Sequence, residues 1–134
     1  RGTTTEQRGV RLVLDAGALI GIERNERRVA GLIELGRRAG AELVTTAPVV
    51  AQAWRHGSRQ ARLARALAMI QVEPVDLEAS QDAGELLAAS RTSDAIDALL
   101  AMLVRHSDQV LTSDPGDLAT LLDARKVKVI VVSV

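Results

Sequence analysis

Short apolar runs alternate along this chain with longer segments in which apolar residues recur at helical intervals. The short runs predict strands at residues 11–15, 43–46, 71–75, 109–112 and 127–132. The longer segments predict helices at residues 26–39, 48–54, 59–69, 77–89, 93–106 and 115–123, and residues 16–22 also shift toward helical spacing. Because strands that alternate with helices pair in parallel, we expect an α/β fold with helices on both faces of the sheet.

One domain is expected, over residues 11–134. The 134 residues can bury a core of their own, and no linker, repeat or low-complexity tract divides them. Residues 1–10 are polar and lack the apolar core of a signal peptide, so we interpret them as a disordered tail or a cloning remnant. The longest apolar run, residues 98–104, is far shorter than the ~18 residues of a membrane span. We therefore expect a cytoplasmic protein.

The composition excludes several kinds of site. Cysteine is absent, so neither disulfides nor thiolate metal sites can form. The two histidines, His56 and His106, stand alone near predicted helix ends and are expected at the surface. Trp54 is the only aromatic residue, which excludes the base-stacking platforms of RNA-recognition and oligonucleotide-binding folds. Contacts with nucleic acid would have to use phosphates, backbone and shape.

Four aspartates occupy positions where a folded chain seldom tolerates uncompensated charge. Asp15 ends the first predicted strand, and Asp97 interrupts the apolar stretch 95–104. Asp114 and Asp117 follow the fourth predicted strand. Carboxylates that converge at the carboxyl ends of strands repel one another unless their pKa values rise or they share a cation. The pattern therefore favours a divalent hard metal that acts on a phosphodiester.

Each of these acids also fits an ordinary helix start. Asp15, Asp94 and Asp114 stand at N-cap positions, and Asp97 and Asp117 in first turns, where the helix dipole favours negative charge. Capping and metal binding are compatible, because one carboxylate oxygen can cap while the other faces a cation. The helix that carries Asp97 is apolar nearly all round, and a solvated first-turn acid does not need such a helix. Asp15 and Asp97 therefore carry most of the metal-site prediction.

The formal charge is zero, with 17 basic and 17 acidic residues. If Asp94 joins the four aspartates in one cluster, 12 acidic residues remain against the 17 basic ones. A mildly basic body would then surround an acidic pocket, as a metal-dependent nuclease requires. Arg55, Arg59 and Arg62 lie toward one side of their predicted helices and could follow phosphates. An ordinary solvated surface of mixed charge explains the same residues.

The order of the acidic motifs resembles that of PIN-domain ribonucleases, and among them the small VapC toxins of bacterial toxin-antitoxin operons. The matching motifs are Val13-Leu-Asp-Ala-Gly-Ala-Leu-Ile, Asp97-Ala-Leu-Leu-Ala and Leu111-Thr-Ser-Asp-Pro-Gly-Asp-Leu. The resemblance covers residues 11–134. It implies a three-layer PIN-like fold whose five-stranded parallel sheet has the order 3-2-1-4-5. The strand at 71–75 then falls at an edge, which suits Pro74 because proline cannot donate to the ladder.

The resemblance also implies an activity, which is Mg²⁺- or Mn²⁺-dependent endonucleolytic cleavage of RNA that leaves a 5′-phosphate. Asp15 and Asp97 would be the main metal ligands, Asp114 would complete the pocket, and Asp117 would support it or bind a second metal. Thr112 would lie near the scissile phosphate. The metal would orient and deprotonate water and neutralise the pentacoordinate phosphate. The expected partners are an antitoxin whose peptide covers the acidic pocket and a second copy of the chain in a homodimer.

Two positions depart from the family pattern. The family usually carries a glutamate on the helix after the second strand, where this chain has Gln52. A carboxamide keeps an acceptor oxygen but loses the negative charge, so metal affinity and water activation should fall. Our hypothesis is that Gln52 coordinates the metal directly or through water, which gives a slow but competent site. Gly17 stands where a hydroxyl residue is common.

Two other functions fit parts of the pattern. A catalytically impaired PIN-like protein would bind RNA or a partner without cutting. Receiver-like and haloacid-dehalogenase-like phosphotransfer domains also place an aspartate at a strand end. The dehalogenase pattern needs a second aspartate where Gly17 stands, and a receiver needs an acidic pair near its first strand, which is not evident here.

Overall fold

The computed structural model describes residues 10–134, so residues 1–9 of the predicted tail lie outside the described residues. Five strands form one sheet: β1 (Arg11–Leu14), β2 (Glu42–Thr46), β3 (Gln71–Glu73), β4 (Gln109–Thr112) and β5 (Ile130–Ser133). Their order is β3-β2-β1-β4-β5, and every neighbouring pair is parallel. The predicted α/β fold and the strand order implied by the resemblance are confirmed. Receiver domains have the different order 2-1-3-4-5.

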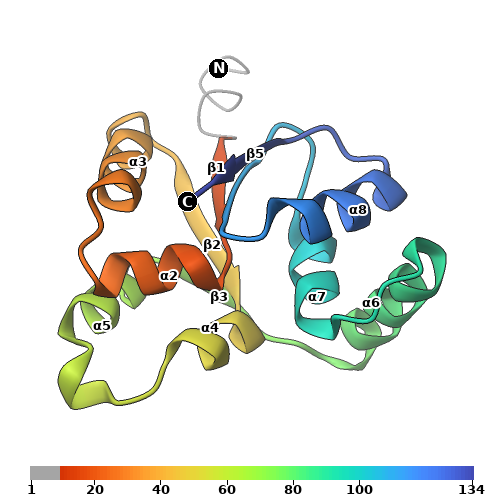
Figure 1. The fold of residues 1–134 in the computed structure, drawn as a ribbon, viewed down its shortest axis with the longest axis horizontal. Helices are drawn as coiled ribbons and strands as arrows, with labels where there is room; N and C mark the ends of the chain where they lie inside the picture. Colours follow the sequence, from red (N-terminus) through yellow and green to blue (C-terminus); the bar gives the residue numbers. More distant parts are fainter. Residues whose placement is uncertain (1–9) are drawn as a thin grey trace.

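Helices cover both faces of the sheet, which gives three layers (Figure 1). One side holds α2 (Ala16–Glu23), α3 (Arg27–Arg38), α4 (Ala47–Ala53) and α5 (Ala61–Leu67), with the short 3-10 helix η1 (Gly57–Arg59) before α5. The other side holds α6 (Leu77–Ser90), α7 (Ala95–Leu103) and α8 (Pro115–Arg125). Among the described residues, no helix is both long and apolar enough to cross a membrane.

The central strands of this parallel sheet are largely buried, because helices cover both faces of the sheet. Every residue of the central strand β1 is buried, and Val13 and Leu14 are 0% exposed. A strand in this position needs an apolar run rather than an alternating pattern, which is why the short runs in the sequence were informative. β3 lies at the edge, as Pro74 predicted, and ends at Glu73 directly before that proline.

Several elements start one to three residues from their predicted positions, and the structure gives a local reason for two of these differences. α5 begins at Ala61, because the Gln60 side chain accepts hydrogen bonds from backbone N–H groups of the preceding loop and holds that loop outside the helix. β5 begins at Ile130 instead of residue 127, because its ladder with β4 starts opposite Gln109, the first residue of β4.

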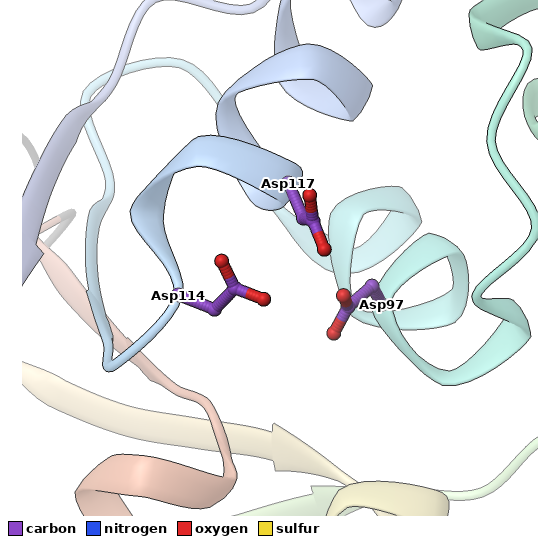
Figure 2. A group of neighbouring side chains, drawn as sticks. All are labelled: Asp97, Asp114 and Asp117. Carbon is purple, nitrogen blue, oxygen red and sulfur yellow. The ribbon is translucent and has the colours of Figure 1, made fainter.

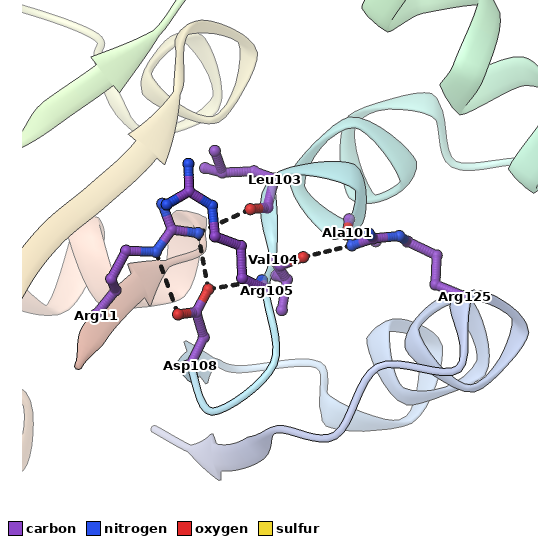
Figure 3. A network of polar contacts seen from close by, with 7 residues as sticks. All are labelled: Arg11, Ala101, Leu103, Val104, Arg105, Asp108 and Arg125. Atoms are coloured by element: carbon purple, nitrogen blue, oxygen red, sulfur yellow. Dashed lines mark hydrogen bonds and ion pairs between the residues drawn. The ribbon is translucent and has the colours of Figure 1, made fainter. Parts of the chain in front are cut away.

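A buried ion pair joins β1 to the turn before β4 (Figure 3). Arg11 Nη2 lies 2.8 Å from Asp108 Oδ2, and Arg11 Nε donates to Asp108 Oδ1 at 3.1 Å. Both residues are almost fully buried, at 5% and 1% exposure. The backbone N–H of Arg105 also donates to Asp108. A buried pair of this kind is retained only when its hydrogen bonds are satisfied, and here they are.

Two arginines hold the C-terminal end of α7 (Figure 3). Arg11 donates from Nη2 to the carbonyl of Leu103 at 2.8 Å, and Arg125 donates from Nη1 to the carbonyls of Ala101 and Val104. The last carbonyls of a helix lack partners within it, and positive charge there is favoured by the helix dipole. These contacts explain why α7 ends at Leu103, before its predicted end.

Candidate metal centre

Asp15 stands where the central strands β1 and β4 end side by side. Its backbone N–H donates to the carbonyl of Leu111 at 3.0 Å, which extends the pairing of the two strands by one bond. Asp15 Oδ1 accepts from the N–H of Ala16 at 2.8 Å, and Oδ2 accepts from the hydroxyl of Thr112 at 2.7 Å. The side chain is only 6% exposed. Asp15 therefore caps α2 with one oxygen and is buried at the strand ends, and its role as a metal ligand stays a prediction.

Thr112 links two of the predicted site residues. Its Oγ1 donates to Asp15 and accepts from the backbone N–H of Asp114 at 3.0 Å. It is 0% exposed, so its hydroxyl orients the two aspartates from within the core. This positioning contact is what the structure shows for Thr112, and its predicted contact with the scissile phosphate stays a prediction.

Three carboxylates converge beside these strand ends (Figure 2). Asp97 comes from the first turn of α7, Asp114 stands at the N-cap position of α8, and Asp117 lies in the first turn of α8. One carboxylate oxygen of each lies within 4.8 Å of the others. Two helix N-termini, each with a partial positive charge, therefore face this group. Asp15 lies outside this group, although its charge acts on Asp97.

The pKa of Asp97 reports the cost of this arrangement. Burial, and after it the negative charges of Asp15, Asp94, Asp114 and Asp117, raise the pKa of Asp97 from 3.8 to about 7. A pKa near neutrality means that the folded chain resists placing a charge there. A bound cation would remove this resistance, because it replaces repulsion with attraction at the same oxygens.

Asp117 shows the same repulsion at the surface. The negative charge of the nearby Asp114 carboxylate raises the pKa of Asp117 above its ordinary value. The group is fully exposed. Asp114 makes no capping hydrogen bond with its side chain, so its carboxylate is free to face Asp97 and Asp117.

Asp94 takes the capping role that was its alternative interpretation. Its Oδ1 accepts from the backbone N–H of Asp97 at 3.0 Å, which satisfies a donor at the start of α7 and fixes the first turn. Asp94 therefore acts on the site by orienting α7 and by its charge. It does not belong to the group of converging ligand oxygens.

Gln52 and the three arginines predicted to bind RNA lie in α4, in η1, in α5 and in the segment between α4 and η1, and coordination of a metal by Gln52 stays a prediction. Gln52 and Arg55 line a cavity beside the ends of α2 and α4. Arg62 lines another cavity between α3 and α5 and donates to the carbonyl of Glu23 at 3.4 Å. Arg59 is exposed in η1. Arg55 and Arg62 thus line two different cavities, and binding of RNA by the three arginines stays a prediction.

The structure explains why residue 17 has no side chain. A Cβ atom on Gly17 would lie 2.4 Å from Oγ and 2.6 Å from Cβ of Ser113, so Ser113 fills the space that a side chain at position 17 would need. The Ser113 hydroxyl therefore lies beside Gly17, in the space where a side chain at residue 17 would begin. Ser113 was not predicted to lie beside Gly17, and only its place next to Thr112 in the third motif could have indicated it.

The two histidines are exposed, as predicted. His56 Nδ1 lies 2.8 Å from the hydroxyl of Ser58, and His106 Nδ1 accepts from the backbone N–H of Lys128 at 3.1 Å. Both therefore have local structural partners, and neither belongs to the carboxylate group.

Comparisons with known proteins agree with this fold. A search of curated sequences found no significant match. A crystal structure of VapBC2 from Rickettsia felis, bound to a DNA fragment from the promoter, contains a chain that superposes with a TM-score of 0.64 at 11% identity. The alignment covers 92% of this chain and 99% of the other. The PIN domain family matches residues 12–120, which is most of the sequence. The protein therefore belongs to the PIN domain family.

Proposed function

We propose that the protein is a metal-dependent endoribonuclease and the toxin of a VapBC-type toxin-antitoxin pair. The observation that carries this proposal is the group formed by Asp97, Asp114 and Asp117, with Asp15 buried beside it. PIN domains are generally nucleases that use divalent metals, and this acidic group lies at the carboxyl edge of the sheet, where α/β folds bind ligands.

The donor set fits Mg²⁺ or Mn²⁺. All of the available side-chain donors are carboxylate oxygens, which are the ligands that hard divalent cations prefer. Asp97 and Asp114 would hold the cation together with Asp15, and Asp117 would support it. When bound, the cation would activate water for attack on the phosphodiester and offset the charge of the phosphate.

The chain's own residues prepare the site without a metal. Thr112 fixes the orientation of the Asp15 carboxylate, and Asp94 fixes the first turn of α7, which carries Asp97. A site whose ligands are held in place needs little reorganisation when the cation and substrate bind.

We also propose an antitoxin and a second copy of the chain as protein partners. The similar Rickettsia felis chain comes from a VapBC2 complex, which supports an antitoxin. A cavity of about 310 Å³ between α3 and α5, lined by apolar side chains that include Ile33 and Ile70, offers space for side chains of a partner. The exposed Leu77 on α6 and Val72 on β3 are candidates for a dimer contact. An RNA substrate would place the protein in the cytoplasm.

A titration with Mn²⁺ and a mixed-sequence RNA substrate tests the activity. We expect cleavage that depends on the metal, that leaves 5′-phosphate ends, and that is abolished by Asp15→Ala and Asp97→Asn. If wild-type protein shows no cleavage above these variants at any Mn²⁺ concentration, the nuclease proposal is wrong.

Gln52 favours a second candidate function. Without the usual glutamate the centre has one negative charge fewer, so a PIN-like protein that binds RNA or a partner without cutting fits the same fold. Gln52→Glu separates the two. A gain in Mn²⁺ affinity and cleavage would indicate that Gln52 coordinates weakly in an active enzyme, whereas binding of RNA with no cleavage by either protein would favour the second candidate.

A further inference from the structure

A cavity of about 290 Å³ lies between the C-terminal ends of α2 and α4. It is lined by Ile20, Glu23, Arg24, Gln52, Ala53, Arg55 and Gln60. No aspartate of the metal centre belongs to this lining. The predicted acidic ligands thus lie outside its lining, and its polar groups require an explanation of their own.

The cavity has a net positive charge. Two arginines and one glutamate line it, and its two glutamines are neutral. Glu23 already serves the fold, because its Oε1 accepts from the backbone N–H of Leu63 at 3.1 Å and so caps the start of α5. Arg24 forms no ion pair with another residue of the described chain. A glutamate in place of Gln52 would cancel the remaining positive charge.

One wall of the cavity is rigid before any ligand binds. Gln60 Oε1 accepts from the backbone N–H groups of Arg55 and His56 at 2.7 and 2.8 Å, and Gln60 Nε2 donates to the carbonyl of Ala53 at 2.9 Å. The Arg55 guanidinium donates from Nη1 to the carbonyls of Ala51 and Trp54. Its direction is thus fixed, and Nε and Nη2 are left to bind a ligand.

The cavity lies along α2 from the metal centre. This helix starts directly after Asp15, and Arg24 follows its last residue, so the rise of the helix places them about 13 Å apart along its axis. A single strand of nucleic acid that extends from the carboxylates along α2 would pass this cavity with a neighbouring part of its backbone. Guanidinium groups recognise phosphate through charge-assisted hydrogen bonds.

We propose that this cavity binds a phosphate of the RNA backbone near the scissile phosphate, through Arg24 and Arg55. The proposal rests on the function proposed above and assigns part of its substrate contact. It also assigns Gln52 a second effect besides that on metal affinity. Because its side chain is neutral, the cavity keeps the positive charge that attracts phosphate.

Fluorescence anisotropy with a labelled mixed-sequence RNA oligonucleotide tests the proposal. EDTA is present so that binding is measured without cleavage. Arg24→Gln should weaken binding by several-fold to about tenfold, and the slope of log K against log salt should become shallower by about 0.7, as for the loss of one phosphate contact with a single strand. Gln52→Glu should also weaken binding. Arg105→Gln removes the same charge at an exposed position before the start of β4, at the end of the sheet opposite to the carboxylates. This variant should leave the RNA affinity and the salt slope unchanged.

Arg55→Gln removes contacts that organise its loop, so Arg24→Gln is the decisive variant and its thermal stability is measured in parallel. If Arg24→Gln, folded like wild type, binds RNA with the same affinity and salt slope as Arg105→Gln, the proposal is overturned. Failure to cleave RNA would instead refute the nuclease function while the binding result still decided the cavity's role. Failure of wild-type protein to bind RNA would overturn this proposal too.

Discussion

Removing the negative charge of Asp97 should stabilise the metal-free protein at alkaline pH. The folded-state pKa of Asp97 is about 7, against 3.8 in the unfolded chain, so the folded state binds this proton more tightly. The stability that the proton contributes is complete below the unfolded pKa and is lost as the pH rises through about 7. A shift of about 3 units, at about 1.36 kcal/mol each, makes the full loss ~4 kcal/mol.

Asp97→Asn keeps the shape of the side chain but has no charge to desolvate. Urea unfolding in EDTA, followed by circular dichroism, should show the variant more stable than wild type at every pH above the unfolded pKa. The difference should grow by about 2–3 kcal/mol between about pH 5 and pH 8.5. In thermal unfolding the full effect corresponds to a Tm difference on the order of 10 °C. Asp82→Asn, at an exposed position on α6, controls for the loss of one negative charge.

Mn²⁺ should reverse the order of stability, so that wild type becomes more stable than Asp97→Asn. A cation bound only by the folded state stabilises it, and wild type has the Asp97 carboxylate that the variant lacks. Protons compete for the same oxygens, so Mn²⁺ affinity should fall as the pH drops below about 7. If wild type and Asp97→Asn change in stability in parallel across the whole pH range, Asp97 is not held in a repulsive, desolvated position, and the energetic case for a cation there fails.

Three further variants test contacts around the site. Gly17→Ala should destabilise the fold by about 1–3 kcal/mol, because its Cβ would overlap Ser113, and adding Ser113→Gly should restore most of the loss in a double-mutant cycle of urea unfolding. Thr112→Val removes a buried hydroxyl that joins two aspartates, so stability should fall by about 1–3 kcal/mol and calorimetry should show weaker Mn²⁺ binding; unchanged Mn²⁺ affinity would remove its positioning role. Asp108→Ala leaves Arg11 buried without its partner and should cost about 3–5 kcal/mol in urea unfolding, whereas a loss below 1 kcal/mol would show that the pair is not shielded from water.

The fold was predictable because its three central strands, β1, β2 and β4, are largely buried on both faces. Such strands need continuous apolar runs, and these runs are visible without any knowledge of their partners. The ends of elements were less predictable, because tertiary contacts decide them. α7 stops where the guanidinium of Arg125, from another helix, takes its carbonyls, and β5 starts only where β4 is present to pair with it.

The candidate site was predictable to the extent that strand ends determine it. Asp15 and Asp114 follow β1 and β4, which are neighbours, so their proximity follows from the topology. Residues that reach the site or its surroundings only through tertiary contacts could not be predicted from the sequence. Arg24 reaches its cavity only because α2 and α4 lie side by side, and nothing in the sequence pairs Ser113 with residue 17.

The two ends of α7 together explain how the fold tolerates its acidic group. At the N-terminus, repulsion among carboxylates pushes Asp97 away from its neighbours, and a loosely packed helix would relieve that repulsion by moving. At the C-terminus, guanidinium groups from β1 and α8 hold the last carbonyls, and Arg11 is itself fixed by a buried ion pair. Movement of α7 would break these hydrogen bonds in a region shielded from water, where each is costly to lose. The helix therefore keeps its carboxylate in the repulsive position, where a proton or a bound cation, rather than relaxation of the fold, would relieve the repulsion.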